Sequence, residues 1–148
     1  MKKGLIVAAL AATAVAMPAT SSADSAQKST AKGGMDLSIT FDLVKRGNDP
    51  IRIENFKFEH FTAPCAVNGP AEIKGTIGQI GLNDREKFRS VAKTKNGNGK
   101  VIVEGQVRQN GDKTIGTLKA KGNFKGGARD CTATINWEAT PPPRTGAA

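Results

Sequence analysis

Apolar and polar residues alternate along most of the chain after residue 34. In the C-terminal stretch 131–139, CTATINWEA, small or apolar side chains occupy every second position, and the same pattern runs through 37–43, LSITFDL. A period of two sends successive side chains to opposite faces of an extended chain, so that one face is buried and the other meets water. These stretches are therefore predicted to be half-buried β-strands.

Turn residues separate these strands at short intervals. Residues 96–99, NGNG, and 110–112, NGD, are typical of hairpin turns, and 45–50, KRGNDP, combines glycine, asparagine and proline in a third turn. The resulting pattern has about seven or eight short strands, spaced roughly 8–12 residues apart. It predicts an all-β fold, a single antiparallel β-sandwich or barrel.

Two stretches interrupt the regular alternation. The buried face changes between Ile53 and Phe56, which predicts a β-bulge near residues 54–55. Residues 83–95 can start a helix, because Asn83 is followed three positions later by a glutamate, but their apolar residues also alternate. The hairpin turn that follows favours a strand here.

The first 23 residues have the order of a secretory signal peptide. Lys2 and Lys3 precede an uncharged, weakly apolar run, 5–17, and small residues follow at the expected cleavage site before Asp24. The run is too short to span a bilayer. A cleaved signal peptide over 1–23 is therefore predicted, and with it a secreted, extracellular protein.

The rest of the chain divides into three parts. Residues 24–34 are small and polar without periodicity, which predicts a disordered lead. Residues 35–140 hold all of the predicted strands and form the secreted β domain. Pro141 to Pro143 cannot extend a sheet, so 141–148 are expected to be a flexible tail. No later stretch is apolar and long enough to be a transmembrane anchor.

The two cysteines, Cys65 and Cys131, both lie in the part predicted to be exported. In an oxidising compartment two cysteines most simply pair with each other. A zinc site would need about four ligands, and the chain has a single histidine, His60. A nucleophilic cysteine would need a base and would leave its partner thiol unpaired. A structural disulfide is therefore predicted, with no metal site and no cofactor.

Five motifs follow one another between residues 36 and 140. They are FEHFTAPCAVNG at 58–69, KF at 87–88, VIVEGQV at 101–107, TIGTLKAKG at 114–122 and DCTATINW at 130–137. Together they resemble a set of small secreted all-β proteins of uncharacterised function found in actinobacteria. The resemblance implies a disulfide-linked β-sandwich and carries no implication of an activity.

A basic excess is the feature of the composition that bears most on function. The chain has 22 lysines and arginines against 13 acidic residues, a formal net charge of +9, and residues 85–100 concentrate it with Glu86 as their one acidic residue. On a strand, alternate residues from Lys87 to Lys95 share one face, which suits an anionic envelope or extracellular polymer, or lipid headgroups. The predicted anion-binding residues are Arg85, Lys87, Arg89, Lys93, Lys95 and Lys100.

Other interpretations of these residues stay open. A lysine-rich face also serves solubility, and lysines protect an edge strand from aggregation. A small secreted hydrolase is the alternative function, with a site around His60 and a carboxylate such as Glu59 or Glu104, but no nucleophile motif accompanies this histidine. We therefore expect a non-enzymatic binding or structural role in a monomeric protein, with an anionic cell-envelope polymer as the partner and no nucleic acid.

Overall fold

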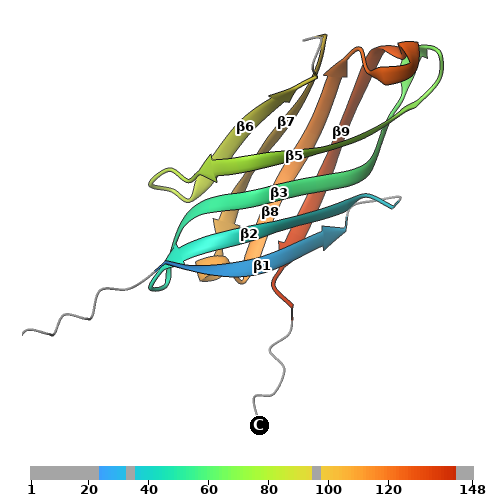
Figure 1. The fold of residues 1–148 in the computed structure, drawn as a ribbon. Helices are drawn as coiled ribbons and strands as arrows, with labels where there is room; N and C mark the ends of the chain where they lie inside the picture. Colours follow the sequence, from blue (N-terminus) through green and yellow to red (C-terminus); the bar gives the residue numbers. More distant parts are fainter. Residues whose placement is uncertain (1–23, 33–35, 95–97, 143–148) are drawn as a thin grey trace, which may run out of the picture.

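The structure is a computed structural model that describes residues 24–32, 36–94 and 98–142 (Figure 1). Nine β-strands make up most of this part of the chain, so the predicted all-β fold is confirmed. Two single-turn 3-10 helices, η2 (Gln109–Gly111) and η3 (Lys125–Gly127), lie in connections. The strands are β1 (Asp24–Lys32), β2 (Ser38–Arg46), β3 (Asp49–Ala63), β4 (Cys65–Val67), β5 (Ala71–Gly81), β6 (Lys87–Lys93), β7 (Gly99–Arg108), β8 (Lys113–Gly122) and β9 (Arg129–Thr140).

The strand pairings in the described residues are all antiparallel. The strands follow the order β5-β3-β2-β1-β9-β8-β7-β6, and β4 lies off this path and pairs with β9. In Figure 1, β1, β2, β3 and β5 form one layer and β6 to β9 form the other, and the pairing of β1 with β9 joins the two layers. β5 and β6 lie close together but form no ladder among the described residues. The sheet is therefore a nearly closed barrel with a sandwich-like shape.

β1 corrects the prediction of a disordered lead over 24–34. Residues 24–32 instead form a strand that pairs with β2 over its whole length and with β9 at its end. Its sequence lacks an apolar period because the side chains that it buries, Ser29 and Ala31, are small. Main-chain hydrogen bonds to neighbouring strands hold it in place, and composition gives no sign of them.

The other predicted boundaries lie partly outside the described residues. The signal peptide predicted over 1–23 and residues 143–148 of the predicted tail are not among them. β9 ends at Thr140, immediately before Pro141. The prolines therefore end the last strand as predicted, because a proline has no N–H to donate to a ladder.

The two irregular stretches form the predicted structures. The ladder between β2 and β3 shifts register at the expected bulge, where Asn55 has a φ of 52°, a value that asparagine tolerates better than most residues. Residues 87–93 form strand β6 rather than a helix. The side chain of Asn83 accepts a hydrogen bond from the Lys87 N–H at 2.9 Å. Asn83 therefore stabilises the turn that leads into β6.

An aromatic cluster fills the centre of the core. Trp137 of β9 is buried, as predicted, and its ring centroid lies 5.8 Å from that of Phe56 and 6.0 Å from that of Phe41. The indole packs over Gly116, the residue opposite Trp137 on β8. A Cβ atom at Gly116 would stand 2.5 Å from Trp137 Cζ2. The indole therefore needs a residue without a side chain beneath it.

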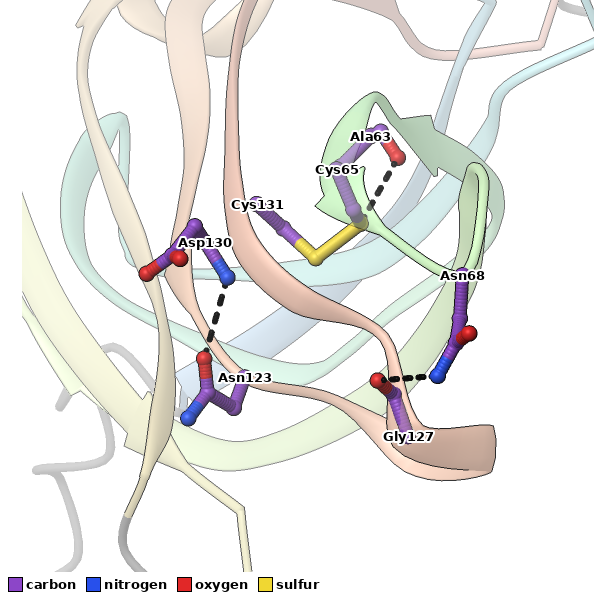
Figure 2. The surroundings of a disulfide bond; sticks show 7 residues. All are labelled: Ala63, Cys65, Asn68, Asn123, Gly127, Asp130 and Cys131. Atoms are coloured by element: carbon purple, nitrogen blue, oxygen red, sulfur yellow. Dashed lines mark hydrogen bonds between the residues drawn. A yellow bond between two sulfur atoms is a disulfide. The ribbon is translucent and has the colours of Figure 1, made fainter.

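A disulfide joins β4 to β9 (Figure 2). Cys65 lies opposite Cys131 in this short ladder, and the two sulfur atoms are bonded at 2.02 Å, which confirms the predicted pairing. Beside it, the Asn68 side chain donates a hydrogen bond of 3.0 Å to the Gly127 carbonyl. The covalent bond and this hydrogen bond attach the connection between β3 and β5 to the start of β9 and to η3, which precedes it.

Candidate anion-binding face

β6 carries three of the six predicted anion-binding residues, Lys87, Arg89 and Lys93, along the outer face of the second layer. Its odd-numbered residues are exposed, while Phe88 between two of them is buried in the core. This is the alternation expected of a strand with one wet face. The exposed members of the predicted set are Arg85, Lys87, Arg89, Lys93 and Lys100, and Lys95 lies outside the described residues.

The register of the second layer brings lysines from three strands side by side. Lys93 of β6 lies opposite Lys100 of β7, and Lys100 lies opposite Lys121 of β8. We call these three residues the lysine row. Neighbouring strands are about 4.8 Å apart, and like charges directly opposite each other destabilise a sheet. Lys121 was not among the predicted residues. Pairing residues outward from the predicted 110–112 hairpin would have placed it opposite Lys100.

No carboxylate within the described part of the chain forms an ion pair with the lysine row. The ion pairs found there involve other cations, such as Arg46 and Arg52 with Asp24. The imbalance extends over the face, because β6, β7 and β8 carry eight basic residues and one acidic residue, Glu104. β1, β2, β3 and β5 carry seven basic and six acidic residues. β9, the fourth strand of the second layer, adds one basic and two acidic residues, so the excess positive charge is concentrated on β6, β7 and β8.

Glu104 divides the cationic face into two unlike parts. Its carboxylate lies 2.8 Å from Lys119 Nζ and 3.7 Å from Arg89 Nε, and the Thr117 hydroxyl donates to it at 3.4 Å. The hydrogen bond from Lys119, together with the charges of Lys119 and Arg89, lowers the pKa of Glu104. Arg89, a predicted anion-binding residue, therefore already has an anionic partner within the protein, whereas the lysine row has none among the described residues.

Two shallow, open depressions border Glu104. One, of about 690 Å³, crosses β6 to β9 over the backbone of Gly105 and Gly116, and the other, of about 580 Å³, lies between the end of β5 and β6. Lys87 and Glu104 line both. Neither is an enclosed pocket of the kind that usually surrounds a small substrate. The outer surface of the second layer is therefore an open face.

His60 lies on the opposite layer, away from this face. It occupies a second bulge of β3 with a φ of 59°, and its Nδ1 atom is 3.1 Å from Glu72 Oε1. The two side chains are 57% and 63% exposed, and His60 lines neither depression. Among the residues that the structure describes, no three or more histidine, cysteine, aspartate or glutamate side chains form a group that could hold a metal ion.

No protein-family model, no curated protein and no solved structure matches the chain. The resemblance to actinobacterial secreted proteins therefore stays a prediction. Across the residues that the structure describes, no helix has the length and apolar character needed to cross a membrane.

Proposed function

We propose that this is a secreted, non-enzymatic β domain that binds a ligand with repeated negative charges, in the cell envelope or the extracellular medium, through the outer face of β6, β7 and β8. The lysine row is the observation that carries the proposal. Three ammonium groups on adjacent strands repel one another, and an anionic polymer or surface would relieve that repulsion at all three positions at once.

Protection of an exposed edge explains only part of this charge. β6 is the last strand in the order of the sheet, so lysine on it can prevent pairing with another molecule. β7 and β8 have paired neighbours on both sides. Lys100 and Lys121 therefore protect no edge, and binding of an anion accounts for them better.

Secretion rests on two features that support each other. Residues 1–23 have the charge and hydropathy pattern of a signal peptide. The Cys65–Cys131 disulfide is of the kind that persists in oxidising compartments and is rare in the cytosol. An extracellular location accounts for both features, since a signal peptide directs export and an oxidising medium preserves the disulfide.

The lysine row is tested by replacing its three members with glutamine, K93Q/K100Q/K121Q, in the chain from residue 24 onward. We expect the affinity for inorganic polyphosphate at low salt to fall about 150-fold, since each of the three lysines contributes about 1 kcal/mol near a negative surface and every 1.4 kcal/mol is a tenfold change in affinity. The affinity of the unaltered protein should also fall steeply with added salt. Binding is measured by titration across a salt series, and purified envelope fractions are tested in the same way.

The matched control is K28Q/K57Q/K74Q, which removes the same charge from exposed positions on the other layer. We expect this variant to keep at least half of the affinity. Equal losses in the two triple variants would show that net charge alone drives binding, and would overturn the proposed face. Binding that does not respond to salt would overturn the proposed function as a whole.

A second variant tests the same face in the opposite direction. Replacing Glu104 with glutamine should raise polyphosphate affinity about threefold, because Arg89 and Lys119 lose their carboxylate partner. Glu59→Gln, which removes a paired carboxylate from the other layer, should leave affinity nearly unchanged. A reduced affinity in the Glu104 variant would contradict the proposal.

Protonating Glu104 at low pH should also free Arg89 and Lys119 from their carboxylate partner. The lowered pKa of Glu104 means that its ion pairs persist at and above the ordinary value of 4.5 and are lost as pH falls through the lower folded value. The stability that they contribute is lost over the same range. Affinity for a phosphate ligand that stays ionised should therefore rise only below pH 4.5.

A further inference from the structure

Aliphatic side chains stand on the wet face of the second layer, beside the lysine row. Val91 of β6 is 38% exposed, and Ile102 of β7 lies directly opposite it. The outward positions of a half-buried strand are normally polar. Among the described residues, the exposed large aliphatic side chains are Val91 and Val67 of β4, and Val91 lies within the cationic face.

Basic side chains are the main neighbours of this aliphatic pair, with Arg89 two residues before Val91 on β6 and the acidic Glu104 two residues after Ile102 on β7. Val91 and Ile102 are each two residues along their strands from Lys93 and Lys100, a separation of about 6.6 Å. Lys119 of β8 lies opposite Ile102 on its other side. The outer face therefore presents two aliphatic side chains that have the lysine row on one side, Arg89 and Glu104 on the other, and Lys119 next to Ile102.

We propose that the ligand of this face is an anionic lipid bilayer surface. The lysine row would bind the headgroup charges, and Val91 and Ile102 would enter the boundary between headgroups and acyl chains. The inference rests on the proposed function and names its ligand class. A water-soluble polyanion would bind the lysines but leave Val91 and Ile102 in water. A lipid surface satisfies both kinds of side chain.

The cationic face is open enough for contact with an extended surface. The face is open and its residues lie on paired strands, so they keep their positions without a partner. Lysine stems can lie along apolar surface while their ammonium groups reach headgroup oxygens. The charge-balanced layer of β1, β2, β3 and β5 lies on the other side of the fold (Figure 1). The cationic layer would therefore face the lipid and the balanced layer would face water.

Co-sedimentation with vesicles tests the aliphatic contact. The probes are vesicles of phosphatidylglycerol and phosphatidylcholine in equal parts, vesicles of phosphatidylcholine alone, and inorganic polyphosphate. We expect binding to the anionic vesicles and little binding to the neutral ones. Replacing Val91 with serine should weaken binding to anionic vesicles about fivefold to tenfold, because a partly exposed valine would no longer be buried in the bilayer. It should leave polyphosphate affinity unchanged.

Val67→Ser is the matched control, because Val67 is 41% exposed but lies on β4, outside the face. It should bind anionic vesicles as the unaltered protein does. A loss in both valine variants would show that general hydrophobicity drives binding, and would overturn the proposed docking surface.

A variant that is expected to bind more tightly gives a test that a folding defect cannot imitate, because misfolding would weaken binding. The chain has one tryptophan, Trp137, which is buried, so its emission should not respond to vesicles. Val91→Trp places a second indole on the exposed face, where tryptophan favours the membrane interface. We expect stronger binding to anionic vesicles and a blue shift of emission with vesicles, and no blue shift with polyphosphate.

The two proposals fail in different ways. If polyphosphate and anionic vesicles both bind, but Val91→Ser weakens neither and Val91→Trp gives no blue shift, the lipid inference is overturned and the anion-binding face stands. If the protein binds polyphosphate and no vesicles, the ligand is a soluble polyanion. If it binds none of the probes, or binds neutral vesicles equally well, the proposed function is overturned together with the inference.

Discussion

Removing the disulfide with the double substitution C65A/C131A is expected to lower the free energy of unfolding by about 4 kcal/mol and the melting temperature by about 15 °C. The two cysteines are 66 positions apart in the sequence. Without the bond the unfolded chain has a higher conformational entropy, which favours unfolding. Thermal and urea unfolding of the double variant and the unaltered protein measure the difference. A melting temperature within 3 °C of the unaltered protein's would contradict this account.

Two further measurements separate the cross-link from the loss of the cysteine side chains. Reducing the unaltered protein should reproduce most of the effect of C65A/C131A, since it breaks the bond and keeps both residues. The double variant itself should not respond to the reductant. Alkylation of the denatured, unreduced protein should find no free thiol, because both cysteines of the chain are in the bond.

Replacing Gly116 with alanine is expected to lower the free energy of unfolding by about 2–3 kcal/mol. The added Cβ would meet Trp137 Cζ2 at 2.5 Å and the Glu104 carbonyl oxygen at 2.6 Å. One of these atoms belongs to a ring packed in the core and the other to the backbone of a paired strand, so neither can move freely. Urea unfolding, with near-ultraviolet circular dichroism to report on the environment of the indole, measures the effect.

Gly78→Ala of β5 is the control for this substitution. A Cβ at Gly78 would have no atom within 4 Å, and the backbone there has no left-handed φ. Its effect should be neutral or slightly stabilising, because alanine narrows the unfolded ensemble. Equal decreases in the free energy of unfolding of the two variants would show that contact with the indole is not the cause of the effect at Gly116.

These stability effects and the binding effects should be separable. The Cys65–Cys131 bond and the aromatic cluster lie in or beneath the sheet, whereas Lys93, Lys100 and Lys121 are exposed on its outer face. Surface substitutions away from buried features usually change stability by less than about 0.5 kcal/mol. The triple lysine variant should therefore lose ligand affinity at unchanged or slightly higher stability, since it removes a row of like charges.

Much of the fold is predictable from local pattern. Alternation placed β2 and β9, and the glycine and asparagine turns placed the hairpins around β7. The change of face at residues 53–56 marked a bulge that the ladder contains at Asn55. These features are local. Alternation along a strand and the backbone conformations open to turn residues both depend only on residues that are close together in the sequence.

β1 shows where such reasoning fails. Its buried residues are serine and alanine, so its pattern resembles that of a polar linker. What makes it a strand is the pair of neighbours, β2 and β9, that supply main-chain hydrogen bonds on its two sides. Strand formation there depends on pairing with other strands, and one of these partners, β9 (Arg129–Thr140), is distant in sequence.

The candidate site divides in the same way. The sequence alone determined that 85–100 is basic, that its alternate residues share one face of a strand, and that the two cysteines pair. The tertiary structure alone decided that Glu104 forms ion pairs with Arg89 and Lys119, that the lysine row has no such partner among the described residues, and that Val91 and Ile102 lie exposed or half-buried beside that row. The physical reason is register: a strand's own sequence sets which side chains share a face, but the pairing of separate strands sets which of them become neighbours.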